Sequence, residues 1–260
     1  MKKLALLFVI VSLAMASTSF AQIRFQQVIE IQVAPVHQPA FEDYILKIKE
    51  AADKIESPVG WGMYQIVVGK PSPGYRVSLG FNTWAERDQW GTVPDMLTEA
   101  FGEQEAARML RDGRLGIVSE RSSIWEYLED GTSNRRTGNQ PVNFVEVTIR
   151  HVTREMVPEY RELQRKWKAA YEASSDKPSV TRRILRYGDG AGATFKRNAA
   201  FDTWAERDGW RIPEILREQF GEEGNQLNNR TMGRALEAVE TFVVARRPDL
   251  SRSASSPPSD

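Results

Sequence analysis

One stretch of this sequence occurs twice. The segment FNTWAERDQW, which begins at Phe81, returns as FDTWAERDGW from Phe201, a displacement of 120 residues. After a gap of one residue the similarity continues, so that 14 of 22 aligned positions are identical. Identity at this level indicates an internal duplication, and a repeat of this kind has to be found before any fold is assigned. The chain is therefore expected to contain one α+β unit written twice.

Each copy shows the same succession of patterns. A strand with alternating apolar residues comes first, a helix with apolar residues at a spacing of 3.6 follows, and two strands joined by a glycine-rich turn precede a second helix and a last strand. The order β-α-β-β-α-β is the ferredoxin-like plan. The first strands cover residues 28–33 and 144–149, the first helices 41–55 and 156–171, and the last strands 123–128 and 239–244.

The ends of the chain differ from the repeats. Residues 1–21 combine two lysines, an apolar run and small residues before Gln22, which is the pattern of a cleaved secretory signal. The alternative, a membrane anchor, needs an apolar run of about 20 residues, and this run is shorter. The predicted organisation is a signal peptide, a first repeat at 22–130, a linker at 131–142, a second repeat at 143–246 and a disordered tail at 247–260. The mature protein is expected to be secreted or periplasmic, with no membrane association after cleavage.

Composition excludes several functions. The chain has no cysteine, which rules out disulfides, thiolate metal ligands and a cysteine nucleophile. The net charge is +0 and no basic stripe is present, so a nucleic-acid partner is not expected. Residues 23–130 carry 11 Lys and Arg against 17 Asp and Glu, whereas residues 143–249 carry 19 against 17. The difference indicates either drift after duplication or an anion held by the second copy.

The duplicated order and the FxTWAERD junction between third strand and second helix resemble the dimeric α+β barrel superfamily. The junction is similar to that of NIPSNAP-like and antibiotic-biosynthesis-monooxygenase-like domains, and the resemblance covers residues 24–130 and 143–246. It implies two tandem ferredoxin-like units whose sheets face each other around a cavity. In this superfamily two chains usually form the barrel; here the two copies are expected to form an intramolecular pseudo-dimeric α+β barrel, as in chlorite-dismutase-like proteins. A monomer and a homodimer both remain open.

The repeated TWAERD motif has a structural interpretation. Thr83 and Thr203 are placed to accept a hydrogen bond from the amide three residues later, and Glu86 and Glu206 are placed to reach back to the cap. This capping box accounts for the motif without any chemistry.

The first strands are more informative about function. If Ile29, Ile31 and Val33 face the helices, Glu30 and Gln32 face the cavity, because side chains alternate along a strand. The same reasoning, with a displacement of 116, turns Glu146, Thr148 and Arg150 toward the cavity. A carboxylate in a partly dry cavity has a raised pKa and can act as a base, so Glu30 and Glu146 are the catalytic candidates. The alternative is that each glutamate pairs with an arginine and only joins the halves.

Arginines and one histidine complete the candidate site. Arg183 and Arg197 lie in strands of the second copy, where an arginine fork suits a carboxylate or phosphate, although a solvated edge strand is the alternative. His151 ends a first strand near the expected cavity mouth. Haem-degrading relatives carry a histidine on the second helix, and the WAERD helices carry none, so neither a cofactor nor a metal is predicted.

Three functions stay open at this level. The first is an exported barrel that binds a small molecule, with an anion as one candidate, between its two repeats. The second is a cofactor-independent oxygenase or isomerase with a cavity glutamate as base. The third is a structural or partner-binding module whose barrel is filled by side chains.

Overall fold

Eight antiparallel strands form a closed barrel within the single chain. The computed structural model describes residues 23–70, 73–133, 142–174, 179–210 and 212–254, so the predicted signal peptide and most of the predicted linker lie outside the described residues. The strand order is β1-β3-β2-β8-β5-β7-β6-β4. The strands are β1 (Phe25–Val33), β2 (Gly62–Val68), β3 (Gly74–Phe81), β4 (Ile117–Tyr127), β5 (Phe144–Val152), β6 (Ser179–Tyr187), β7 (Thr194–Phe201) and β8 (Leu236–Arg246).

Each half of the chain contributes one continuous set of four strands. The first half forms β4-β1-β3-β2, and the second half forms β8-β5-β7-β6. The two sets join through the antiparallel pairs β2–β8 and β4–β6, which close the barrel and leave no free sheet edge. The α+β class and the barrel expected within one chain are confirmed.

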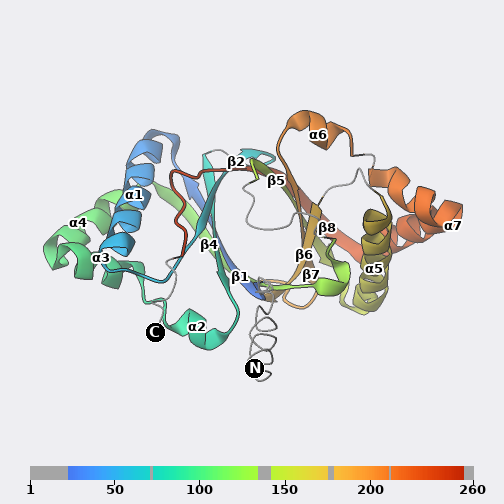
Figure 1. The fold of residues 1–260 in the computed structure, drawn as a ribbon, viewed down its shortest axis with the longest axis horizontal. Helices are drawn as coiled ribbons and strands as arrows, with labels where there is room; N and C mark the ends of the chain where they lie inside the picture. The colour runs from blue at the N-terminus through green and yellow to red at the C-terminus, as the bar shows by residue number, and fades with distance from the viewer. Residues whose placement is uncertain (1–22, 71–72, 134–141, 175–178, 211, 255–260) are drawn as a thin grey trace, which may run out of the picture.

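Helices cover the outside of the barrel on two opposite sides (Figure 1). The first half carries α1 (Gln38–Lys54), α2 (Trp84–Asp88), α3 (Val93–Phe101) and α4 (Glu103–Arg114). The second half carries α5 (Val157–Ala173), α6 (Trp204–Asp208) and α7 (Ile212–Ala235). The α3–α4 break at Gly102 (φ 83°) has its counterpart in a kink of α7 at Gly221 (φ 65°), where only glycine enters this backbone region without strain. No described helix combines the length and apolarity that crossing a membrane requires.

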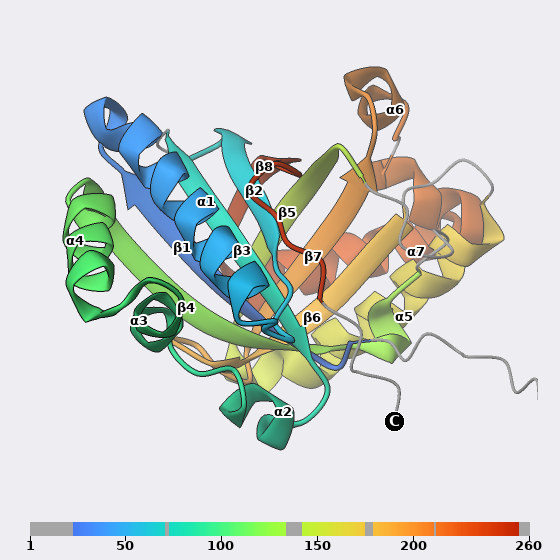
Figure 2. The ribbon, with the colours of Figure 1, turned by 60° about the vertical axis from the view of Figure 1, so that its left-hand side comes forward.

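The sheet therefore has an outer face under the helices and an inner face toward the barrel axis. In the first half, α1 lies across the outer face (Figure 2) and buries Phe41, Ile45 and Ile48 against Ile31 and Val33 of β1. The inner face packs a separate apolar cluster, which consists of Val28, Ile66, Trp125, Val147, Ile149, Leu185, Phe242 and Val244. The centre of the barrel is thus filled by side chains.

The two halves correspond in a register that differs from the one expected. Phe25 pairs with Phe81 and Phe144 with Phe201, and both pairs stack with ring centroids 5.3 Å apart. These aromatic pairs place Gln27, not Glu30, in correspondence with Glu146.

The register difference overturns one prediction. The displacement between first strands is 119, three more than the expected 116, and an odd shift exchanges the two faces of a strand. Ile29, Ile31 and Val33 face the helices as predicted. Val147 and Ile149 instead pack inside the barrel, while Glu146, Thr148 and Arg150 lie on the outer face, contrary to the expectation that they face the barrel cavity.

The threonine caps are present as predicted, whereas the glutamates reach the amide one residue before the cap and not the amide of the cap itself. Thr83 accepts from the amide of Glu86 at 3.1 Å and Thr203 from that of Glu206 at 3.2 Å. The glutamate carboxylates return a contact to the amides of Asn82 and Asp202, each at 2.8 Å. The repeated motif thus starts two short helices by satisfying their free amides.

The C-terminal segment is ordered where disorder was predicted. Residues 247–254 run back beside α1 of the first half (Figure 1), and Leu250 is buried there. Arg247 contacts Glu42 at 2.8 and 2.9 Å, and the indole nitrogen of Trp61 donates to the carbonyl of Leu250 at 2.9 Å. Low apolar content did not reveal this segment, because one buried side chain, Leu250, and hydrogen bonds to the first half hold it. The last part of the predicted tail, residues 255–260, lies outside the described residues.

Candidate functional site

An apolar pocket lies between the outer face of the first half and its helices. Its volume is about 340 Å³, which lies at the lower end of the range for small-molecule sites. The sheet contributes the floor, with Ile29, Ile31, Met63, Val77 and Leu79. The walls come from α1 with Phe41, Ile45 and Ile48, and from α3 and the segment before it with Trp90, Val93 and Met96.

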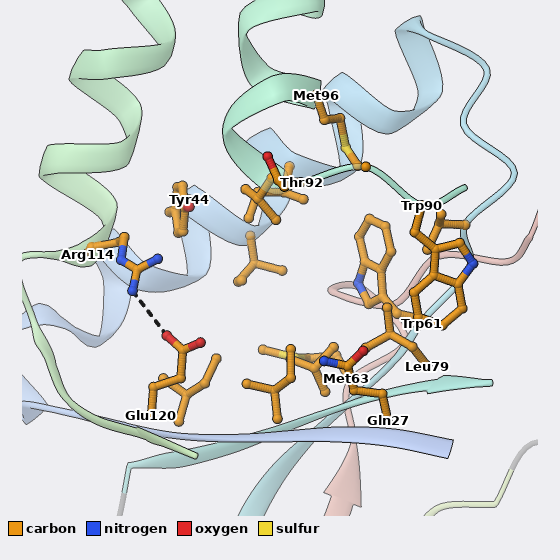
Figure 3. A pocket seen from close by; sticks show the side chains of 18 of the residues that line it. Gln27, Tyr44, Trp61, Met63, Leu79, Trp90, Thr92, Met96, Arg114 and Glu120 are labelled. Atoms are coloured by element: carbon orange, nitrogen blue, oxygen red, sulfur yellow. Dashed lines mark hydrogen bonds and ion pairs between the residues drawn. The ribbon is translucent and has the colours of Figure 1, made fainter. Parts of the chain in front are cut away.

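Polar groups stand at the two ends of this first-half pocket (Figure 3). At one end Arg114 forms an ion pair with Glu120 at 3.2 Å, and Tyr44 lies nearby. Burial raises the pKa of the Tyr44 hydroxyl, Arg114 opposes that rise and Glu120 adds to it, so the phenol stays protonated at neutral pH. At the other end Trp61 and Trp90 approach Gln27. The Nε of Arg87 donates to the Gln27 side-chain oxygen at 2.8 Å.

Glu30 lies inside the barrel, as its predicted face requires, but it is paired. Lys70 donates to its carboxylate at 2.8 Å, and Arg76 lies opposite on β3. Burial raises the pKa of Glu30, but Arg76 and Lys70 together outweigh burial, so the pKa is lowered rather than raised. A carboxylate in this state is a weak base, which corrects the expectation of a raised pKa.

Glu146 is paired still more closely, on the other face of the sheet. It accepts from Arg197 at 2.8 Å and from Arg207 at 2.8 and 3.1 Å. Burial raises the pKa of Glu146, and the two arginines more than offset that effect, so this pKa is lowered too. The expected common site of the two glutamates does not exist, because one side chain points into the barrel and the other toward α5.

The structure brings together half of the predicted site residues. Glu146, Thr148, Arg150 and Arg197 line a second-half pocket of about 280 Å³ under α5, together with Trp167, Tyr171, Arg182, Arg207, Val239 and Thr241. This pocket is the counterpart of the first-half pocket on the other side of the barrel.

The remaining predicted residues lie apart from it. Gln32 donates to the carbonyl of Pro73 at 2.9 Å at one end of β1. The His151 Nδ1 and the Thr194 hydroxyl are 3.2 Å apart at the end of β5. Arg183 faces the barrel interior, with its guanidinium 5.6 Å from the ring centre of Tyr127. None of these residues lines either helix-side pocket.

Sequence reasoning missed the first-half pocket entirely. Its apolar residues carry the same 3.6 and two-residue periods as an ordinary core, so pattern alone cannot separate a lined cavity from a filled one. The polar Gln27 on the outward face of β1 was the available signal. It becomes visible once Phe25 is aligned with Phe144, because Gln27 then matches Glu146 and both contact the arginine of a WAERD helix.

The described residues offer little for a metal or for haem. In the described ranges, no group of three or more His, Cys, Asp and Glu side chains is placed to hold a metal ion. The described lining residues of both helix-side pockets include no histidine, a common axial ligand of haem iron.

Comparison with solved structures identifies the fold. An anthrone oxidase-like protein superposes with a TM-score of 0.53 at 13% identity, covering 91% of this chain and 95% of that one. A proposed monooxygenase from Fusobacterium nucleatum gives 0.53 at 7% identity, covering 86% and 92%. A chlorite dismutase variant from Candidatus Nitrospira defluvii gives 0.51 at 10% identity, covering 86% and 91%. No protein-family model and no curated protein matches the sequence.

These similarities place the chain among dimeric α+β barrel folds. They show the fold alone, because one fold hosts many unrelated activities and the identities are low. The expected barrel fold is thus shown, whereas membership of the superfamily and the likeness to NIPSNAP-like domains in particular are not. Function has to be argued from the pockets.

Proposed function

We propose that the protein binds a small, largely apolar molecule in the first-half pocket. The observation that carries the proposal is the pocket itself, a cavity of about 340 Å³ between helix and sheet with an apolar floor and with polar groups at its two ends. A ring-bearing molecule fits this shape, since Trp61 and Trp90 offer aromatic faces. Tyr44 and Gln27 are placed to hydrogen-bond a hydroxyl or carbonyl at either end.

The space between the two repeats is a weaker candidate for this ligand. The barrel centre is packed by Val28, Trp125, Phe242 and their neighbours. A hollow of about 680 Å³ lies toward one end of the barrel, where the C-terminal residues Ser251–Ala254 form part of its wall. The hypothesis of a structural or partner-binding module predicted a barrel filled by side chains, which agrees with the packed centre. The helix-side pockets lie outside the barrel and are still open to a ligand.

The enzymatic alternative receives less support. An oxygenase or isomerase that uses Glu30 or Glu146 as base needs a carboxylate that is free to take a proton. Both carboxylates are held by cations and both have lowered pKa values, which favours a role in joining strands and helices. Binding without catalysis is the simpler proposal.

A filled-pocket variant tests the proposal. The neutral probe 1-naphthol is expected to quench tryptophan fluorescence of the mature protein saturably, because Trp61 and Trp90 line the pocket. Val77→Phe fills the floor and should abolish saturable quenching. Val118→Phe, an exposed position on β4, is the matched control and should leave it unchanged. Unaltered quenching in the Val77 variant, with folding verified by circular dichroism, would refute the assignment of the pocket.

The proposal includes three finer points of organisation. Each half is a ferredoxin-like unit, supported by the strand order β4-β1-β3-β2 and its repeat β8-β5-β7-β6. The TWAERD junctions support a relationship to NIPSNAP-like domains. Because the two halves already close one barrel, the protein is proposed to work as a monomeric pseudo-dimer, with a homodimer as the alternative that sedimentation would reveal.

Export is the last part of the proposal. The basic and apolar pattern of residues 1–21 supports secretion or export to a periplasm. Expression of the full chain followed by N-terminal sequencing of the exported form tests it. The expected terminus is Gln22, and retention of the uncleaved chain in the cytoplasm would contradict it.

A further inference from the structure

The second-half pocket gathers positive charge that the other described residues do not neutralise. Four arginines line it, Arg150, Arg182, Arg197 and Arg207, against the single carboxylate of Glu146. That carboxylate is shared by Arg197 and Arg207. The lining therefore holds a net charge of +3, contributed by four guanidinium groups and one glutamate.

Several of these guanidinium groups keep unused donors. Arg182 is only 2% exposed, yet among the described residues none forms a salt bridge or a side-chain hydrogen bond with its guanidinium. Within the part of the chain that the structure describes, the Nε atoms of Arg150 and Arg182 and the Nη2 of Arg197 are buried without a hydrogen-bond partner. Burial lowers the pKa of Arg182 to about 10, with Tyr160 and Tyr171 opposing this effect, so the group is still charged at neutral pH. Buried charges are normally paired, and a cluster without a counter-ion is unfavourable.

Comparison of the halves shows that these arginines are specific to one pocket. The strand pairs place Ile29, Ile31, Met63 and Val77 of the first half at the positions of Thr148, Arg150, Arg182 and Arg197 of the second. All eight residues line their respective pockets. Four apolar floor positions in one copy thus carry a threonine and three arginines in the other. A core that merely had to be filled would not need charges at three adjoining positions.

We propose that the second-half pocket is an anion site that binds a small oxyanion, a carboxylate or a phosphate, between Arg150, Arg182 and Arg197. Two oxygens that share a negative charge match the fork of a guanidinium group, and three such groups can satisfy one oxyanion from different sides. Thr148 adds a hydroxyl on the same face. The site is separate from the first-half pocket, with which it shares no lining residue.

Thermal unfolding in defined anions tests the inference. The mature protein is heated at pH 7 in sodium phosphate, in sodium succinate and in sodium chloride of equal ionic strength. A bound oxyanion stabilises the folded state by mass action, so phosphate or succinate should raise Tm by several degrees more than chloride does. A response to phosphate alone identifies the phosphate class, and a response to succinate alone identifies the carboxylate class. Equal Tm values in all three salts would overturn the inference.

Two variants assign the response to the site. Arg182→Met should raise Tm in chloride, because it removes a buried charge without a partner, and should abolish the extra shift in the oxyanion. Arg111→Met, at a position 72% exposed on α4, removes one charge from the surface and should keep the full shift. If the Arg182 variant does not fold, Arg150→Met provides the same measurement at a less buried position. A full oxyanion shift in a folded Arg182 or Arg150 variant would also overturn the inference.

Discussion

Replacing Glu146 by glutamine tests how strongly the second half depends on one buried ion pair. The side chains of Glu146 and Arg197 are 6% and 7% exposed, so the pair is shielded from water. Removing one partner of a buried pair destabilises a protein by about 3–5 kcal/mol, because the other charge remains buried and uncompensated. Arg207 is 41% exposed and adds less than about 1 kcal/mol, since solvent screens its charge. Glutamine keeps one hydrogen-bond acceptor for Arg197, so we expect a destabilisation at the lower end of this range, about 3 kcal/mol.

The pH dependence of the same variant provides an independent check. The pKa of Glu146 is lowered from its ordinary value of 4.5, since Arg197 and Arg207 outweigh the opposing effect of burial. A carboxyl group with a lowered folded-state pKa contributes stability above its unfolded pKa, and this contribution is lost as pH falls through the folded value. The difference in unfolding free energy between wild type and Glu146→Gln should therefore have its full size at pH 7 and become smaller below a pH of about 4.5.

Urea unfolding followed by circular dichroism measures both effects. At pH 7 the expected loss is about 3 kcal/mol of unfolding free energy, which in a thermal unfolding experiment corresponds to a fall in Tm of roughly 6–12 °C for a chain of this size. Glu105→Gln breaks an exposed pair with Arg108 on α4 and is the matched control, with little expected change because solvent screens both charges. A loss at Glu146 no larger than at Glu105 would refute the view that the pair holds β5, β7 and the WAERD helix together.

Two further substitutions probe other parts of the fold. Lys196 is 1% exposed, and burial, then Arg76 and Arg183, lower its pKa well below 10.5 against the opposing effect of Glu30. The unfolded chain then binds more protons than the folded protein, so the free energy of unfolding should rise with pH up to the unfolded pKa. Lys196→Met should flatten that rise and, because it removes a buried charge, stabilise the protein at pH 7. Destabilisation in urea at pH 7 would contradict this. Arg252 donates from the C-terminal segment to the carbonyls of Ala52, Ser57 and Val59. Arg252→Met should therefore lower the free energy of unfolding by about 3 kcal/mol, detected as an unfolding midpoint at lower urea when Trp61 fluorescence is followed. An unchanged midpoint would show that the segment is not anchored.

Local sequence patterns predicted much of the fold because they depend on near neighbours. The strands and helices expected from alternation and from the 3.6-residue period, and the capping threonines Thr83 and Thr203, follow from residues a few positions apart, and the structure contains them. The inward face of Glu30 also follows, because alternation along one strand is a local property. The alternative expectation, that each glutamate pairs with an arginine, agrees with the contact of Glu146 with Arg197, whereas the hydrogen-bond partner of Glu30 is Lys70.

The candidate pockets required the tertiary structure. A sequence comparison guided by the shared glutamates matched Glu30 to Glu146, whereas cross-strand pairing matched Phe25 to Phe144 through Phe81 and Phe201. The difference of three residues was enough to exchange the two faces of β5, since side chains alternate with a period of two. Pairing of strands that are distant in sequence sets the register, so no local pattern contains it.

The sequence by itself therefore determined a duplicated α+β chain with two capped WAERD helices and an arginine-rich second copy. Only the tertiary structure decided that the barrel closes within one chain, that its centre is filled, and that two pockets lie on opposite sides beneath the helices. The physical reason is that a cavity is the volume left over when distant elements pack. Its lining is apolar in one half and cationic in the other because Ile31 and Arg150 occupy the same place in two copies of one sheet.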